Sequence, residues 1–164
     1  MATTNGGHEV ARPGQRQVVW SCSDCGTTDA DLAYSSGRMR RCKDCQRFWN
    51  VQVNARRPRK RTAAPLLMFD RTAFLAWVHG KPRICSYCGV EERRLKTLAL
   101  RTQIGRSLES LGIDRVNNDG PYALDNIDLC CLPCNKAKGN VFSATEMHEV
   151  GRGIAKVWDL RDPA

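Results

Sequence analysis

The sequence has no long apolar run and few aromatic residues. No stretch approaches the roughly 20 consecutive apolar residues that a membrane-spanning helix needs, so we expect no membrane segment. The first residues, MATTNGGHEVARPGQ, hold no apolar segment with a small-residue cleavage site, so we expect no secretory signal and a cytoplasmic protein. Aromatic residues make up 7% of the 164 residues, which indicates that something besides a large apolar core must stabilise the fold.

Cysteine is abundant instead. Eight of the nine cysteines fall into four pairs with CxxC spacing, whereas a disulfide framework has a more irregular spacing. In a reducing cytoplasm such pairs bind zinc far more often than they oxidise. We therefore predict two structural Zn²⁺ ions per chain, each held by four thiolates.

The spacing assigns these thiolates to two sites. The members of the first site are Cys22, Cys25, Cys42 and Cys45. The members of the second site are Cys85, Cys88, Cys131 and Cys134. Cys130 is left over because Cys131 has the CxxC spacing with Cys134, although Cys130 stays the alternative ligand.

Basic residues outnumber acidic ones. The chain has 26 Lys and Arg against 17 Asp and Glu, a formal net charge of +9. This balance favours a polyanionic partner, for which we predict double-stranded DNA, and we expect no small-molecule cofactor. The basic run ARRPRKRT over residues 55–62 is either a solvated linker or an arm that follows phosphates.

Two helices are indicated by their end signals. Asp70 as N-cap and Gly80 as C-terminal stop predict a helix over residues 69–80. Ser143 and Glu146 form a capping box that predicts the start of the last helix. Its predicted apolar stripe, for core or dimer packing, is Met147, Val150, Ile154, Val157 and Trp158, and we expect His148 to be a surface residue.

Residues 111–140 predict two strands followed by a helix. LGIDRV suits a first strand, NNDG a turn, residues 123–129 a second strand, and Pro133 the start of a helix. In such a ββα unit, Asp114 near the end of the first strand faces Asn135 in the first turn of the helix. A carboxylate and an amide oxygen then converge on one catalytic divalent cation, for which we predict Mg²⁺.

These residues resemble the HNH (ββα-metal) endonuclease family, in which an Asp-His pair, a central Asn and a final His or Asn lie on a ββα unit. Here the pattern consists of Asp114 with Arg115, then Asn126, then Asn135. Arg115 stands where the family places the His that activates the attacking water. A guanidinium does not act as a base at neutral pH, so the activating group must lie elsewhere.

A longer resemblance, from about residue 22 to 158, is to the rare-cutting type II restriction endonucleases of this family. It rests on both cysteine clusters and on the motifs FLAW (74–77), YCG (87–89), LGxDR (111–115), GxY (120–122), CNxxK (134–138) and FSAxEM (142–147). The resemblance implies a homodimer at palindromic DNA sites, with two structural zinc ions and one catalytic cation per subunit. It also implies that Asp114 and Asn135 bind the cation, that Arg115 contacts a phosphate and that Asn50 lies near the site.

The group that activates water has three candidates. The resemblance implies a tyrosine directly after FLAW, where this sequence has Val78 and then His79. We predict His79, because an imidazole with an ordinary pKa of about 6.5 can take a proton from water. The alternatives are Tyr87, which we expect rather to pack against its own zinc loop, and Arg115.

Together these features predict a small, zinc-stapled α+β fold. We expect a disordered tail over residues 1–18, a four-cysteine zinc module over 19–54, a basic linker over 55–64, and a ββα-metal nuclease domain over 65–164 with the second four-cysteine site and a C-terminal helix. The predicted function is a type II HNH restriction endonuclease. The alternatives are a homing or junction-resolving HNH endonuclease, and a non-catalytic zinc-ribbon DNA-binding protein.

Overall fold

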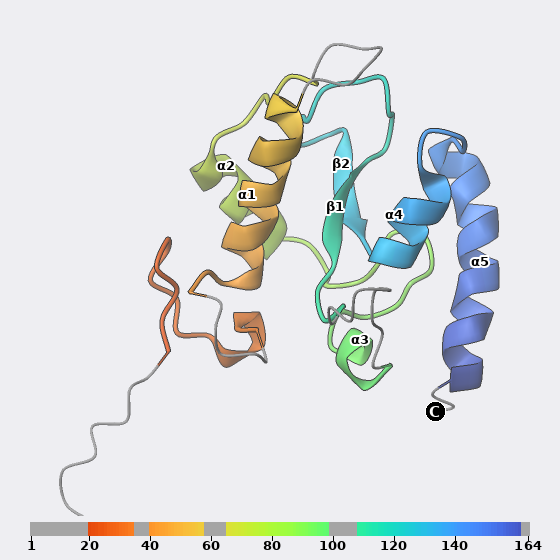
Figure 1. Ribbon diagram of the computed structural model, residues 1–164, viewed down its shortest axis with the longest axis horizontal. Helices are drawn as coiled ribbons and strands as arrows, with labels where there is room; N and C mark the ends of the chain where they lie inside the picture. The colour runs from red at the N-terminus through yellow and green to blue at the C-terminus, as the bar shows by residue number, and fades with distance from the viewer. Residues whose placement is uncertain (1–19, 35–39, 58–64, 99–107, 162–164) are drawn as a thin grey trace, which may run out of the picture.

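Figure 1 shows the computed structural model, which describes residues 20–34, 40–57, 65–98 and 108–161. Its elements in chain order are a 3₁₀ turn (Ala30–Leu32), α1 (Lys43–Arg56), α2 (Arg71–His79), α3 (Arg94–Thr97), β1 (Gly112–Arg115), β2 (Ile127–Cys130), α4 (Leu132–Lys138) and α5 (Ala144–Arg161). The predicted tail over residues 1–18 and residues 58–64 of the predicted linker lie outside the described residues. The small α+β fold predicted from the sequence is confirmed, with a two-stranded sheet flanked by helices (Figure 1).

The sheet and α4 form the predicted ββα unit. β1 and β2 are antiparallel, and Asp114 lies opposite Asp128. β2 begins at Ile127, later than predicted, because the Asn126 N–H donates to the Ala123 carbonyl at 2.9 Å and closes a turn there. The turn places the start of β2 opposite the end of β1, where Arg115 pairs with Ile127.

Helices α2 and α5 begin as the sequence predicted. Oδ1 of Asp70 accepts the N–H of Ala73 at 2.8 Å, and Gly80 follows the last residue of α2. At α5, the Glu146 carboxylate accepts the Ser143 N–H at 2.8 Å, while the Ser143 hydroxyl accepts the Glu146 N–H at 3.3 Å. Each bond satisfies a backbone donor that the first turn of a helix leaves unpaired, so both caps are confirmed.

The apolar stripe of α5 packs onto the core with one exception. Met147 and Trp158 are buried, and Ile154 is partly buried against the same cluster. Val157 is 42% exposed, so it is not part of the core, and dimer packing, the other predicted role of the stripe, stays a prediction for this residue. Trp158, the next residue in the sequence, is buried instead.

Gly151 brings α5 close to a loop of the chain. A Cβ atom built on Gly151 would lie 2.3 Å from the carbonyl oxygen of Tyr87, closer than any real contact. Only glycine therefore allows this approach. None of the helices in the described segments is long and apolar enough to cross a membrane.

Helix α1 lies where the sequence predicted the end of a zinc module and the start of a linker. Its Phe48 and Val51 are buried in one core cluster with Phe74 and Val78 of α2. The rings of Phe48 and Phe74 have centroids 5.6 Å apart. The predicted boundary between residues 54 and 55 thus falls inside α1, which joins the first cysteine cluster to the main core.

Arg47 ties α1 to the start of β1. Its buried guanidinium pairs with Asp44 and Glu92, and its Nε donates to the Leu111 carbonyl at 2.8 Å. The Glu92 carboxylate also accepts the Leu111 N–H at 2.7 Å. Because Leu111 directly precedes β1, these bonds fix the helix and the strand side by side, as Figure 1 shows.

Asp44 is the acidic centre of this network. Burial opposes its ionisation, but the neighbouring guanidinium groups of Arg83 and Arg47 outweigh burial and lower the pKa of Asp44. Arg83 donates to both Asp44 carboxylate oxygens, at 2.5 and 2.6 Å. Buried charges are costly unless paired, and here each carboxylate oxygen meets a cation.

Candidate functional site

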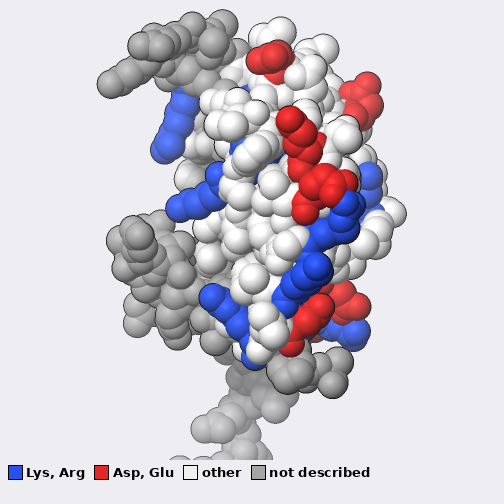
Figure 2. Space-filling model, turned by 90° about the vertical axis from the view of Figure 1, so that its right-hand side faces the viewer, with Lys and Arg blue, Asp and Glu red and all other residues white. Residues whose placement is uncertain are grey.

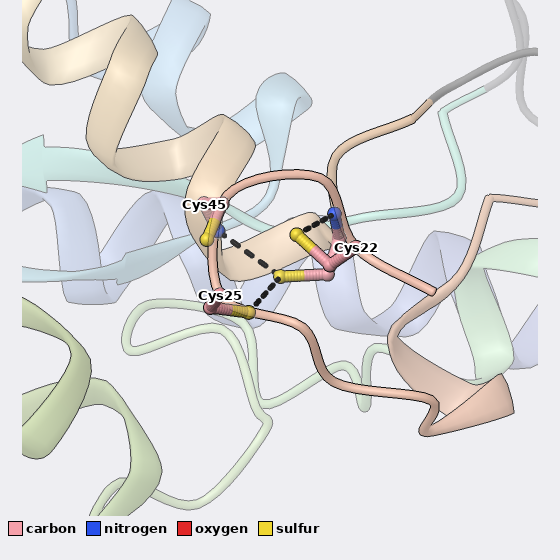
Figure 3. A group of neighbouring side chains, drawn as sticks. Cys22, Cys25 and Cys45 are labelled. Carbon is pink, nitrogen blue, oxygen red and sulfur yellow. Dashed lines mark hydrogen bonds between the residues drawn. The ribbon is translucent and has the colours of Figure 1, made fainter. Parts of the chain in front are cut away.

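The first cysteine cluster lies where α1 begins. Figure 3 shows Cys22 and Cys25 on one loop, facing Cys45 on the helix. Together with Cys42, their sulfur atoms lie within 4.8 Å of one another. The Cys42 N–H donates to the Cys22 sulfur at 3.2 Å, and the Cys45 N–H donates to the Cys42 sulfur at 3.3 Å. Burial opposes ionisation of Cys22, but backbone donors from Cys42 and Asp24 outweigh it and lower the pKa of Cys22 to about 6.

The second cysteine cluster joins the loop before α3 to the base of α4. Its members, all buried, are Cys85, Cys88, Cys131 and Cys134. Cys130 is also buried but stands outside the cluster, and its thiol donates to the Cys131 carbonyl at 3.3 Å. The structure therefore brings Cys131, rather than Cys130, to the other three sulfur atoms.

Both clusters fit a tetrahedral zinc ion. Zn–S bonds of about 2.3 Å in tetrahedral geometry place neighbouring sulfur atoms about 3.8 Å apart. The sulfur atoms of Cys25 and Cys42 are 3.8 Å apart, and those of Cys88 and Cys131 are 3.7 Å apart. The eight thiols could therefore hold two zinc ions.

A polar cleft of about 450 Å³ opens beside the ββα unit. Asp114 and Arg115 of β1 and Asn135 of α4 line it, so three of the predicted site residues meet in one place. Asn54 and Arg57, at the end of α1, also line it. The other lining residues are Ile113, Asn118, Tyr122, Gly139 and Asn140.

Two buried groups hold the Asp114 carboxylate. The Tyr87 hydroxyl donates to Oδ2 of Asp114 at 2.7 Å, and Nζ of Lys138 lies 3.0 Å from the same oxygen. Burial and the adjacent carboxylate raise the pKa of Tyr87, so its hydroxyl keeps its proton and donates. With both donors on Oδ2, the other oxygen, Oδ1, is the one suited to a cation in the cleft.

Lys138 connects Asp114 to the rest of the ββα unit. Its side chain is fully buried, and its ammonium also donates to the Arg115 carbonyl at 2.6 Å and to Oδ1 of Asn118 at 3.0 Å. An ammonium has three protons, and here each has an acceptor. Lys138 therefore fixes the end of β1, the following turn and Asp114 relative to α4.

Asn135 supplies the second oxygen donor. Its Nδ2 donates to the Ile113 carbonyl at 3.3 Å, which identifies Oδ1 as the amide atom suited to a cation. A carboxylate oxygen and an amide oxygen are hard donors of the kind that Mg²⁺ takes while keeping several waters. The donor set therefore fits a divalent cation.

Comparison with solved structures decides the family. The rare-cutting HNH restriction endonuclease PacI, whose structure is described for its mechanism of DNA perturbation, matches with a TM-score of 0.75 and 33% sequence identity. The match covers 88% of this chain and 99% of PacI. The chain belongs to the HNH endonuclease family. No protein-family model and no curated protein sequence matches it.

Arg115, which the sequence assigned to the histidine position of the HNH motif, lines the cleft. Its guanidinium donates to the Gly120 carbonyl at 2.7 Å and lies 5.2 Å from the centre of the Tyr122 ring. The residue is buried, with 6% of its surface exposed. Its predicted contact with a phosphate stays a prediction, and its position in the cleft lining is compatible with that contact.

The central asparagine of the HNH motif shapes the turn between the strands. Oδ1 of Asn126 accepts the Asn117 N–H at 2.9 Å, and Nδ2 donates to the Pro121 carbonyl at 2.8 Å. A Cβ atom on Gly120 would lie 2.7 Å from Nδ2 of Asn126, so the close fit requires glycine. Asn126 thus holds the loop that carries Gly120, to which Arg115 donates.

His79 and Asn50 do not line the HNH cleft. His79 is 58% exposed at its side chain, and its Nε2 lies 3.5 Å from Oδ2 of Asp44, in a separate hollow. Asn50 is exposed on α1, where its Oδ1 accepts Nε2 of Gln46 at 3.0 Å. Of the three candidates for activating water, Tyr87 and Arg115 are the two that contact the site.

Two further residues have roles that no sequence pattern indicated. In the sequence, Lys138 stood out only as the last residue of the CNxxK motif, and His148 was expected to be a surface residue. His148 is exposed, but its ring packs edge-on against the Tyr87 ring with centroids 5.3 Å apart. It thus forms part of the surroundings of a residue that touches Asp114.

Proposed function

We propose that this HNH protein is a type II restriction endonuclease that hydrolyses DNA phosphodiester bonds at a short palindromic site. The observation that carries the proposal is the meeting of Asp114, Asn135 and Arg115 in one polar cleft on the ββα unit. The similarity to PacI, a rare-cutting HNH restriction endonuclease, supports it. The free, clustered thiols suit the reducing cytoplasm as its compartment.

Each residue of the cleft has its own role in this proposal. A bound Mg²⁺ would supply a Lewis acid that stabilises charge on the scissile phosphate and the leaving oxygen. The Oδ1 atoms of Asp114 and Asn135 would hold it, and Tyr87 and Lys138 would keep Asp114 oriented. Arg115 would add a fixed positive charge near the phosphate, and the net charge of +9 would attract the DNA backbone.

We propose a homodimer on DNA. One ββα site cuts one strand, so a palindrome requires two copies related by a two-fold axis. The face that carries α5, shown in Figure 2, mixes acidic and basic side chains instead of forming one basic patch. Val157 and Leu160 are exposed on α5, which favours this helix for contact with a second copy. Sedimentation on a cleavable duplex tests this, and a purely monomeric complex would contradict it.

Digestion of sequenced plasmids tests the activity. The full-length protein is incubated with several plasmids, with Mg²⁺ added or omitted, and the cut ends are mapped by sequencing. Mg²⁺ is removed by dialysis, because a strong chelator would also remove structural zinc. We expect Mg²⁺-dependent cuts at one recurring palindrome, and no cuts by Asp114→Asn although this variant still binds DNA.

The other outcomes identify the alternatives. Cuts at a long asymmetric site would indicate a homing enzyme, and a preference for branched DNA would indicate a junction-resolving one. Binding to DNA with no cleavage under any divalent cation would favour a zinc-ribbon DNA-binding protein. Each of these results would overturn the restriction activity.

A further inference from the structure

The exposed side of α1 carries a stripe of amides that runs into the cleft. Gln46, Asn50 and Asn54 follow one another at four-residue intervals, so they lie on one face of the helix. The hydrogen bond from Nε2 of Gln46 to Oδ1 of Asn50, at 3.0 Å, agrees with this placement. At the end of the stripe, Asn54 and Arg57 line the cleft that contains Asp114. We call Gln46, Asn50 and Asn54 the amide stripe.

The fold does not require these residues. Asn is among the poorer helix formers, yet α1 has Asn at two positions, both exposed. The residues of α1 that stabilise the fold are others: the helix buries Phe48, Val51 and the Arg47 network. The amide stripe therefore contributes polar groups to the surface at some cost in helix propensity.

The charge of this surface suits DNA. The single acidic residue of α1, Asp44, is fully buried among Arg47 and Arg83, so the described surface of the helix carries no carboxylate. Arg56 and Arg57 are exposed at its end. A polyanion can therefore approach α1 without repulsion from its own side chains.

We infer that α1 is the recognition helix of this protein and that Gln46 and Asn50 contact base edges next to the cleaved bond. This inference rests on the proposed DNA cleavage. A carboxamide offers a donor and an acceptor together, the pattern that pairs with the N6 and N7 atoms of adenine in the major groove. A DNA strand that passes Asp114 in the cleft also passes Asn54 and Arg57. It thereby reaches the amide stripe.

The rigid attachment of α1 makes it suitable for this task. Two members of the first cysteine cluster lie at its start, Cys42 as the N-cap residue and Cys45 in the first turn, and Arg47 bonds to the carbonyl of Leu111 just before β1. The helix and the strand that bears Asp114 therefore form one unit. The bases touched by the amide stripe thus lie at a fixed distance from the bond that is cut.

Binding selection on random DNA tests the inference separately from cleavage. The full-length protein is mixed with a library of duplexes of random sequence in Ca²⁺, and the bound duplexes are sequenced. Asn50→Ala and Gln46→Ala are compared with the wild type. Gln52→Ala is the matched control, because Gln52 is an amide on the same helix that faces a different hollow, beside Trp49 and Phe69.

We expect Asn50→Ala and Gln46→Ala each to relax the preference for one base pair per half-site by about 5- to 100-fold, the usual worth of a bidentate base contact. Gln52→Ala should select the wild-type sequences. Zinc content and thermal unfolding of each variant show that the fold is retained, as the exposure of Asn50 leads us to expect.

Two results would overturn the inference. One is an unchanged preference in both variants, and the other is an equal loss of binding to all sequences, which would indicate phosphate contacts only. Adding Mg²⁺ to the same complexes then measures cleavage. Failure to cut would count against the proposed activity, whereas the selected sequences alone decide whether α1 reads bases.

Discussion

The hydroxyl of Tyr87 lies 2.7 Å from Oδ2 of Asp114, although the two residues come from a zinc loop and a strand. The bond connects the second cysteine cluster to Asp114 in the cleft, because Tyr87 lies between its members Cys85 and Cys88. The loop that could hold a zinc ion thus also holds the Asp114 carboxylate.

Tyr87→Phe should therefore slow cleavage without unfolding the protein. The ring still fills its buried position, but Asp114 loses one of its two donors. Replacing a partner that orients a metal ligand lowers activity or metal affinity by about 10- to 100-fold. Single-turnover cleavage over a range of Mg²⁺ concentrations measures the loss. A rate equal to that of the wild type would show that the bond has no catalytic importance.

Lys138→Met should destabilise the protein and reduce cleavage. The variant leaves Asp114, the Arg115 carbonyl and Asn118 without their shared cation, and breaking a buried ion pair costs about 3–5 kcal/mol. Chemical denaturation measures the free energy of unfolding. Lys136→Met, an exposed position on the same helix, is the control and should change stability little. Equal stability of the two variants would contradict the role given to Lys138.

His79→Ala should cleave DNA at nearly the wild-type rate. The sequence predicted His79 as the base, but its imidazole faces Asp44 and does not line the cleft. Because the side chain is largely exposed, its contact with Asp44 should contribute at most about 1 kcal/mol to stability. Single-turnover rates at saturating Mg²⁺ decide the matter. A loss of about 100-fold or more, typical of a missing general base, would restore His79 to the mechanism.

Elemental analysis should find two zinc ions per chain. Cys131→Ser should lose one of them and unfold the ββα unit, because structural zinc contributes directly to the folding free energy. Cys130→Ser should keep both, since Cys130 lies outside the cluster. One zinc ion in the wild-type protein, or metal loss in Cys130→Ser, would contradict the assignment.

Features with a fixed local spacing could be predicted from the sequence. The cysteine pairs, the capping box of Ser143 and Glu146, and the order of the ββα unit each depend on residues close together in the chain. The family could also be identified, because its motifs recur in the same order along most of the chain. The caps and the strand order need no knowledge of distant contacts, which is why they were correct.

Helix α1 shows what the sequence could not predict. Its buried face combines Phe48 and Val51 with the charged residues Asp44 and Arg47, so no apolar period marks it. The charges are buried only because Arg83, Glu92 and Leu111, far along the chain, supply their partners. The contact between Tyr87 and Asp114 was missed for the same reason, since it joins residues from separate elements.

The close approach of α5 at Gly151 has a consequence for the hydroxyl of Tyr87. The backbone of an 18-residue helix lies directly behind the Tyr87 backbone, so this part of the zinc loop cannot move away from β1 unless the whole helix moves too. A methyl group at position 151 would press the loop toward Asp114 or drive the helix outward. The absence of a side chain at Gly151 therefore determines how close the Tyr87 hydroxyl lies to Asp114 in the cleft.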